Sequence, residues 1–289
     1  MFRGTSTAII TPFTKDNKVD EEGLRRLVEF QEENGIETIV PCGSTGESAM
    51  LSHEEHIRVV EVVVDQVKKA KVLAGAGSNS TSEAVMLSKR AEDLGVDGLL
   101  SISPYYVKPT QEGIYLHFKA IAESVNIPVV VYNIPGRTGS NITADTMLRM
   151  AEIEGIDAVK EASGNLDQMR EIIRRKPKGF EVLSGDDALT PALIRSGGDG
   201  AISVTSNCLP REMVELVRAL LAGDNASADR LIAKLSPIFE TLFVETNPIP
   251  IKYVMSKMGY GSGRLRLPLT ELTEKNRASV DVALRSVGL

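Results

Sequence analysis

The chain has 289 residues, of which 42% are hydrophobic, 25% charged and 4% aromatic. This composition is that of an ordinary globular protein with enough apolar residues for a full core, and it excludes disordered and collagen-like chains. The 33 lysines and arginines are outnumbered by 39 aspartates and glutamates, so the net charge is −6 and no basic domain is present to neutralise a nucleic-acid backbone.

Eight short apolar runs predict buried parallel strands, whose two faces are both covered. In chain order they are residues 7–10, 38–40, 72–74, 98–101, 129–132, 158–160, 182–184 and 201–204. Segments with helical periodicity lie between and after them, at residues 20–34, 52–68, 81–94, 112–124, 143–153, 165–175, 188–195 and 211–221. The second of these begins with a capping box, Ser52 followed three residues later by Glu55. Eight strand–helix pairs predict an α/β fold, a (β/α)8 TIM barrel over residues 1–224.

Three more segments with helical periodicity follow the barrel, at residues 226–243, 248–258 and 270–287. No linker rich in serine and glycine separates them from the barrel. We therefore predict that residues 225–289 form a C-terminal three-helix appendage that packs on the barrel and does not move independently.

The two cysteines, Cys42 and Cys208, are too few for a disulfide framework, which favours a reducing compartment. The first residues lack the apolar core of a signal peptide, and no apolar run approaches the roughly 18 residues of a membrane span. We expect a cytoplasmic protein that binds neither nucleic acid nor a membrane.

One lysine ends a buried apolar strand. Lys160 follows Ala158 and Val159, and an ammonium group is costly to remove from water. In a TIM barrel the carboxyl ends of the strands face the active site. Desolvation favours the neutral amine, which attacks carbonyl groups, so this position predicts a Schiff-base lysine. The alternative is a structural lysine satisfied by a partner side chain.

Two further features follow strands at the same end of the predicted barrel. Tyr132 ends the strand before that of Lys160 and could carry protons beside it, but a tyrosine that only packs fits the position equally well. After the second strand, residues 43–48 (GSTGES) offer hydroxyls and free amides that suit a small carboxylate. An ordinary turn is the alternative for this segment.

Two other motifs are discounted. Residues 75–80 (GAGSNS) half-match a dinucleotide fingerprint, but the sixth residue is Ser80, and Asp97 precedes its strand where the fingerprint needs an acid at the strand's end. His53 and His56 are three residues apart, and the HExxH zinc motif needs a spacing of four. We expect no cofactor and no metal.

Motifs from one end of the chain to the other carry a resemblance to one family. They are residues 8–13 (AIITPF), 46–48 (GES), 103–106 (SPYY), 132–138 (YNIPGRT), 160–165 (KEASGN), 183–187 (LSGDD), 245–250 (ETNPIP) and 265–268 (LRLP). Together they resemble the Schiff-base-forming class I aldolases of the dihydrodipicolinate synthase and N-acetylneuraminate lyase superfamily. The resemblance implies a TIM-barrel lyase in which a lysine forms an imine with pyruvate.

Carried over residue by residue, the resemblance implies that Lys160 forms this imine and that Tyr132 shuttles protons to and from it. The family's tyrosine–threonine–tyrosine relay falls on Tyr132, Ser44 and Tyr106. Serine at position 44 keeps the hydroxyl of the usual threonine but loses the methyl group that restrains χ1. The relay geometry is therefore expected to be looser at this position.

The resemblance also implies where substrates bind. Thr45 falls on the position that holds the pyruvate carboxylate, and the backbone carbonyl of Ile202 lies beside the same site in the family. Arg137 stands where sugar-acid aldolases of the superfamily usually lack an arginine, and a guanidinium suits the carboxylate of L-aspartate-4-semialdehyde. We therefore expect condensation of pyruvate with L-aspartate-4-semialdehyde, a step of lysine and diaminopimelate biosynthesis.

Other functions stay open at this point. The superfamily shares the imine and diverges in the aldehyde, so a 2-keto-3-deoxy sugar-acid aldolase or an N-acetylneuraminate lyase is the nearest alternative. From other classes, the alternatives are a nicotinamide-binding oxidoreductase and a non-catalytic ligand-sensing barrel.

Regulation and assembly follow from the same resemblance. In the family the tyrosine at position 106 enters the relay of the neighbouring subunit, so we expect a tight dimer, doubled into a homotetramer. L-Lysine inhibits some members, and its site falls on Ala49, His53, His56, Asn79, Glu83 and Tyr105. Glu83 could pair with the ammonium group of the ligand. The alternative is that Glu83 is an ordinary first-turn helix acid and His56 a satisfied surface histidine.

Overall fold

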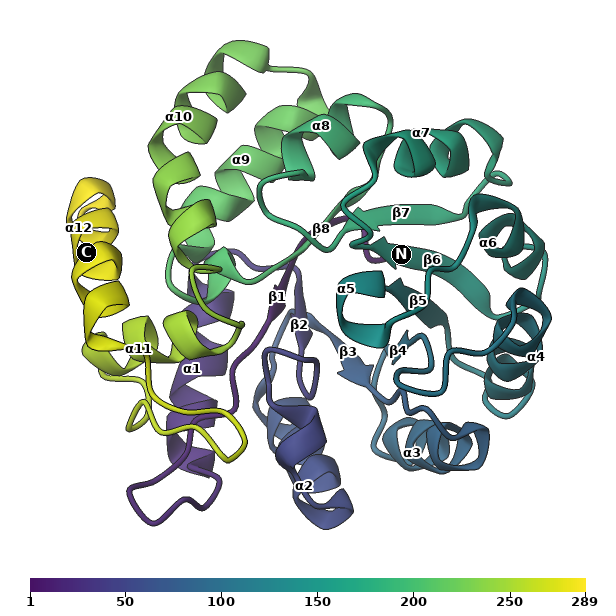
Figure 1. Cartoon of the computed structure of the whole chain (residues 1–289), viewed down its shortest axis with the longest axis horizontal. Coiled ribbons are helices and arrows are strands. Elements are labelled where there is room, and N and C mark those ends of the chain that lie inside the picture. Colours follow the sequence, from purple (N-terminus) through teal and green to yellow (C-terminus); the bar gives the residue numbers. More distant parts are fainter.

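The computed structural model describes all residues, 1–289, and its centre is a closed barrel of eight parallel strands (Figure 1). Each strand pairs with its neighbour in sequence, and β8 pairs with β1 to close the barrel. The strands are β1 (Gly4–Ala8), β2 (Thr38–Val40), β3 (Lys71–Gly75), β4 (Gly98–Ile102), β5 (Val129–Asn133), β6 (Ile156–Glu161), β7 (Glu181–Ser184) and β8 (Gly200–Ser203). The predicted fold class is confirmed.

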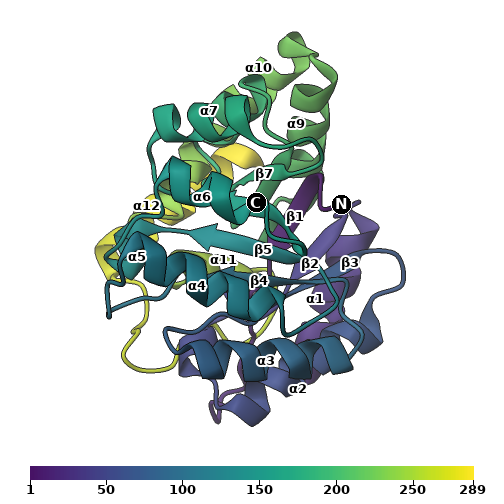
Figure 2. The same cartoon turned by 90° about the vertical axis from the view of Figure 1, so that its right-hand side faces the viewer.

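Helices cover the outside of the barrel, as the views in Figures 1 and 2 show. They are α1 (Glu21–Glu33), α2 (His53–Gln66), α3 (Thr81–Asp93), α4 (Gln111–Ala122), α6 (Ala144–Met150), α7 (Leu166–Arg175), α8 (Thr190–Arg195) and α9 (Pro210–Ala222). The capping box at the start of α2 is confirmed, since Ser52 Oγ accepts from the Glu55 amide and the Glu55 carboxylate accepts from the Ser52 amide.

Three short elements follow strands and were not predicted: η1 (Ser48–Met50), α5 (Pro135–Thr138) and η2 (Thr205–Asn207). One predicted boundary was wrong by several residues. The first strand was expected at 7–10 and is Gly4–Ala8, because Gly4 to Thr7 pair with residues of β8 while the apolar pair Ile9 and Ile10 lies beyond the strand.

The strands separate two apolar clusters because their side chains alternate between the two faces. The large cluster lies between barrel and helices and includes Val129, Val131 and Val159. The small cluster of 10 residues fills the barrel itself and includes Val130, Tyr132 and Ala158. Lys160 is two residues beyond Ala158, so its side chain lies on the interior face at the carboxyl end of β6.

The C-terminal region contains the three predicted helices, α10 (Asn225–Thr241), α11 (Ile249–Lys257) and α12 (Glu274–Val287). Helix α10 packs against α9 of the barrel and against α12. The last helix begins four residues later than expected, because Glu245 holds the backbone amide and hydroxyl of Thr273 just before it. None of the helices of this protein has the length and apolar character needed to cross a membrane.

Candidate active site

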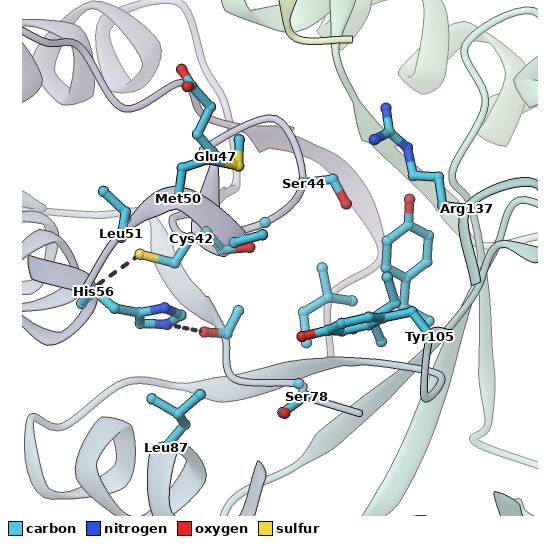
Figure 3. A pocket seen from close by; sticks show the side chains of 18 of the residues that line it. Cys42, Ser44, Glu47, Met50, Leu51, His56, Ser78, Leu87, Tyr105 and Arg137 are labelled. Atoms are coloured by element: carbon cyan, nitrogen blue, oxygen red, sulfur yellow. Dashed lines mark hydrogen bonds between the residues drawn. The ribbon is translucent and has the colours of Figure 1, made fainter. Parts of the chain in front are cut away.

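A cavity of about 530 Å³ opens at the carboxyl ends of β2 to β5. Its walls come from the loop after β2, from the ends of β3 and β4, and from Tyr132 and Arg137 after them. Figure 3 shows Ser44 and Arg137 at one end of this cavity and His56 and Leu87 at the other. The carboxyl ends of barrel strands are where catalytic residues of such enzymes are found.

Lys160 and Tyr132 are direct neighbours at this end of the barrel. They are register partners on adjacent strands, and Lys160 Nζ lies 4.3 Å from the centre of the Tyr132 ring. Lys160 is only 5% exposed, and its ammonium group forms no ion pair with a carboxylate. A Cβ at position 185 would lie 2.9 Å from Lys160 Cε, so Gly185 leaves the space that this side chain occupies.

The environment of this pair moves both of its pKa values. Burial lowers the pKa of Lys160 to about 7, with Asp187 acting in the opposite direction and Arg137 in the same one. Burial raises the pKa of Tyr132 to about 12, against the smaller effects of Arg137 and the Ser44 hydroxyl. Near neutral pH the site therefore combines a substantial fraction of neutral amine with a protonated phenol, which suits imine formation followed by proton transfer.

Asp187 is the buried anion near Lys160. Its Oδ2 accepts hydrogen bonds from the backbone amides of Val204 and Thr205, at 3.1 and 2.8 Å, just after β8. Its other oxygen, Oδ1, is buried without a partner. Burial raises the pKa of this carboxyl.

The loop after β2 brings Ser44 and Thr45 to the site in an unusual backbone conformation. Cys42 before them and Glu47 after them both have left-handed backbones, with φ of 55° and 56°. Ser44 lines the cavity, whereas Thr45 is buried beside it and its Oγ1 accepts a hydrogen bond from Asn247 Nδ2 at 2.9 Å.

Arg137 projects from the short helix α5 into the cavity. Its guanidinium donates to the backbone carbonyl of Asn247 at 2.7 Å. Asn247 thus contacts both Thr45 and Arg137, the two side chains to which the sequence assigned substrate carboxylates.

Five of the candidate residues do not line the cavity: Thr45, Asn79, Tyr106, Lys160 and Ile202. Ile202 is on β8, buried in the cluster inside the barrel. Tyr106 has a left-handed backbone with φ of 72°, is 86% exposed and does not line the cavity of its own chain. An aromatic side chain this exposed is available for contact with another protein molecule.

Five of the six residues assigned to L-lysine line the cavity. His53 Nε2 lies 2.6 Å from one oxygen of Glu83, and the Ser78 hydroxyl donates to the other oxygen. These contacts with Ser78 and His53 lower the pKa of Glu83. His56 is buried, donates to the Gly75 carbonyl at 2.7 Å, and has its pKa lowered by burial. Ala49 and Tyr105 also line the cavity, but Asn79 does not.

The discounted motifs have structural explanations. A Cβ at position 75 would lie 2.1 Å from the carbonyl oxygen of Cys42, and one at position 77 would lie 2.3 Å from the amide nitrogen of Ile102. These glycines therefore permit close backbone approach between neighbouring strand ends.

The His, Cys, Asp and Glu side chains form no group of three or more that could hold a metal ion. Cys42 and Cys208 are both free and buried.

The C-terminal contribution to the cavity was not predicted from the sequence. Asn247, Pro248, Pro268 and Leu269 all line it, although this region was expected only to pack on the barrel. The signal was present in the motifs at 245–250 and 265–268, which stand out from the helical periodicity around them.

Comparison with known proteins identifies a family and agrees with the fold. The sequence model of the Dihydrodipicolinate synthetase family matches residues 1–287. The 4-hydroxy-tetrahydrodipicolinate synthase of Syntrophus aciditrophicus (strain SB) is 51% identical over 290 residues, covering 100% of this chain and 99% of that protein. Dihydrodipicolinate synthase from Aquifex aeolicus has a TM-score of 0.98 at 45% identity, covering 100% and 99% of the two chains. The lysine-bound structure from Cyanidioschyzon merolae has a TM-score of 0.97 at 41% identity, with the same coverage.

Proposed function

The chain belongs to the Dihydrodipicolinate synthetase family, and from this premise we propose that it condenses pyruvate with L-aspartate-4-semialdehyde to 4-hydroxy-tetrahydrodipicolinate. It is an enzyme of the class I aldolase type, and its product leads into lysine and diaminopimelate biosynthesis. The observation that carries the proposal is a buried lysine without an ion-pair partner, stacked on a tyrosine at the mouth of the barrel.

In the proposed reaction, Lys160 Nζ adds to the keto carbon of pyruvate, and the keto oxygen leaves as water. Loss of a proton from the methyl group converts the imine into an enamine, whose methyl-derived carbon then bonds to the aldehyde carbon. The aldehyde oxygen takes up a proton and becomes the hydroxyl group of the product. The amine of the second substrate next adds to the imine carbon and displaces Lys160, which closes the ring and frees the enzyme.

Proton transfers in this sequence need a carrier beside Lys160. We assign that role to Tyr132, with Ser44 next to it and Tyr106 of a neighbouring subunit completing the relay. The contact of 4.3 Å between Lys160 Nζ and the Tyr132 ring supports the first assignment. The exposure of Tyr106 supports the last, because this side chain has no place in its own cavity.

Substrate binding is assigned to the polar groups around that pair. We propose that Thr45 and the backbone carbonyl of Ile202 hold pyruvate, and that Arg137 binds the carboxylate of the aldehyde substrate. A guanidinium that lines the cavity suits the carboxylate of this aldehyde better than the hydroxyl groups of the uncharged aldehydes that the alternative reactions use.

The test is a coupled assay that offers pyruvate with L-aspartate-4-semialdehyde, N-acetylmannosamine or glyceraldehyde in parallel. We expect turnover with the first aldehyde to exceed that with the others by about 10² or more, because only its carboxylate can pair with Arg137. Preference for either of the other aldehydes would favour the sugar-acid alternatives.

We propose a homotetramer built from tight dimers as the assembly, since Tyr106 would act across the dimer interface. Mixing Tyr106→Phe with Lys160→Ala under conditions of subunit exchange tests this. Two nearly inactive variants should regain part of the activity, because one hybrid site carries both Tyr106 and Lys160. No recovery despite proven exchange would show that each site is self-contained.

We propose that L-lysine inhibits the enzyme by binding in the cavity against His53, His56, Glu83 and Tyr105. The carboxylate of Glu83 lines the cavity, and beyond its contacts with His53 and Ser78 it has further lone pairs that an ammonium group can use. The related structure from Cyanidioschyzon merolae has lysine bound. Titration of L-lysine at fixed pyruvate should reduce the rate, and Glu83→Ala should abolish this response. An unchanged rate at millimolar lysine would remove the regulatory proposal alone.

Two further assignments complete the proposal. We divide the chain into a catalytic barrel, residues 1–224, and a C-terminal helical region, residues 225–289, packed on it through α10 and α9. We place the enzyme in the cytoplasm, because a reducing compartment suits its two unpaired cysteines.

A further inference from the structure

A second buried lysine lies outside the proposed chemistry. Lys252 on α11 pairs with Glu47 of the β2 loop at 2.5 Å, and their side chains are 1% and 0% exposed. The two residues are 205 positions apart in the chain. A buried ion pair contributes little net stability, because removing two charges from water offsets their attraction. Its presence therefore calls for a role other than stability.

Other groups surround both members of the pair. Lys252 Nζ lies 3.9 Å from the centre of the Phe13 ring, a favourable position for a cation. Glu47 uses both oxygens, Oε1 for Lys252 and Oε2 for the backbone amide of Arg266 at 3.0 Å. Arg266 is itself fixed, since its guanidinium donates to both oxygens of Glu55 on α2, at 2.5 and 2.6 Å.

The position of Glu47 links this cluster to the candidate site. Glu47 lies two residues after Thr45 and three after Ser44, and its backbone is left-handed with φ of 56° and ψ of 35°. A non-glycine residue in this conformation is strained and persists only where its surroundings hold it. On the other side of Thr45 and Ser44, Cys42 is left-handed as well. The segment with the Ser44 and Thr45 hydroxyls thus has a strained residue on each side. One of these residues, Glu47, forms an ion pair with α11.

We propose that Glu47 and Lys252 are positioning residues: their ion pair holds the Ser44–Thr45 segment in the conformation that binds pyruvate. That the ligand is pyruvate rests on the proposed function. That the ion pair orders the Ser44–Thr45 segment does not depend on the proposed function, because it concerns only the conformation of the loop. In this assignment the C-terminal region acts on the site through Lys252, in addition to lining the cavity with Asn247.

The test compares Lys252→Met, Glu47→Gln and the double variant with a matched control, Lys257→Met. Lys257 is on the same helix and also pairs with a carboxylate, Asp281 at 2.6 Å, but that pair lies away from the β2 loop. The double variant has no charge left at this buried site. The amide oxygen of the substituted side chain can still accept from the Arg266 amide, so the melting temperature should return close to that of the wild type. The double variant lacks only the ion pair between the β2 loop and α11.

Two readouts separate positioning from stability. Hydrogen exchange at residues 42–51 and the KM for pyruvate should each rise about tenfold in both single variants and in the double variant, with kcat changed less than about threefold. Lys257→Met should leave both readouts at the wild-type level. Recovery of wild-type exchange and KM in the double variant, together with its stability, would show that the pair serves stability alone and would overturn the proposal.

Failure of the proposed function would look different. A wild-type protein that forms no adduct with pyruvate contradicts the catalytic assignment. Hydrogen exchange in the wild type and the four variants still decides whether the pair orders the loop. Unchanged exchange at residues 42–51 in the double variant would refute the positioning role whatever the ligand. Should a single variant fail to fold, the double variant, which carries no uncompensated charge, decides the question.

Discussion

Two lysines of this protein are buried, and their surroundings give them opposite properties. Lys160 lies inside the barrel at the end of β6, against the ring of Tyr132 and without a carboxylate partner. Lys252 lies beneath the β2 loop, against the ring of Phe13 and paired with Glu47. Burial lowers both pKa values, to about 7 and about 8. The two pKa values are therefore close. What separates the proposed nucleophile from the structural cation is the ion-pair partner, which Lys252 has in Glu47 and Lys160 lacks.

The largest effect is expected at Lys160. Lys160→Ala should reduce kcat by about 10³-fold or more, because the pathway through a covalent imine is lost and no neighbouring amine replaces it. Borohydride added with pyruvate should trap an adduct on Lys160 in the wild type and in Lys252→Met, and none in Lys160→Ala. Mass spectrometry of the digested protein locates the adduct. Label on Lys252 would reverse the assignment of the two lysines.

The next largest effect is expected at Arg137, which separates binding of the second substrate from the reaction of Lys160 with pyruvate. Arg137→Ala should lower kcat/KM for L-aspartate-4-semialdehyde by about 10²-fold, equivalent to about 3 kcal/mol of charge-assisted bonding. The adduct between Lys160 and pyruvate should still form, since Arg137 acts on the second substrate. Steady-state kinetics with each substrate varied in turn measure this. An unchanged dependence on the aldehyde would contradict the role given to Arg137.

The pH dependence tests whether Lys160 reacts as a neutral amine. With a pKa of about 7, its amine is mostly protonated below that pH, so the rate of imine formation should fall as pH drops and level off above pH 7. Asp187 raises the pKa of Lys160, so Asp187→Asn should shift the midpoint to lower pH, by about half a unit to one unit. Stopped-flow measurement at saturating pyruvate reports the midpoint. A shift to higher pH in Asp187→Asn would show that the sign is wrong.

The sequence predicted those parts of the molecule that depend on local pattern. Apolar runs in alternation with helical segments predicted the barrel, and the rule that strand ends face the active site singled out Lys160 and Tyr132 before any family was considered. The same rule singled out the polar segment 43–48. The resemblance then gave Ser44 and Thr45 their roles and added Arg137, and the structure places all three around the same end of the cavity or directly beside it.

What the sequence did not predict depends on contacts between distant segments. Asn247 meets Thr45 across 202 residues, and Lys252 meets Glu47 across 205. No periodicity or spacing rule reports such pairs, because helical patterns in the C-terminal region describe only which face is buried. The sequence did not indicate that Glu47 would be buried either, since a glutamate in a short polar loop is ordinarily exposed. Its complete burial is a property of the folded chain.

The smallest effect is expected at Ser44, in the loop that the Lys252 pair holds. The family usually has threonine here, and Ser44→Thr adds the methyl group that restrains rotation about χ1. Because the ion pair of Glu47 already fixes the backbone of this loop, the extra restraint should raise kcat by at most about threefold and leave the KM for pyruvate unchanged. In Lys252→Met, whose loop lacks this tie, the same substitution should give a larger gain. Steady-state kinetics of both pairs of proteins measure the difference, and an equal response in the two backgrounds would show that the loop backbone does not depend on Lys252.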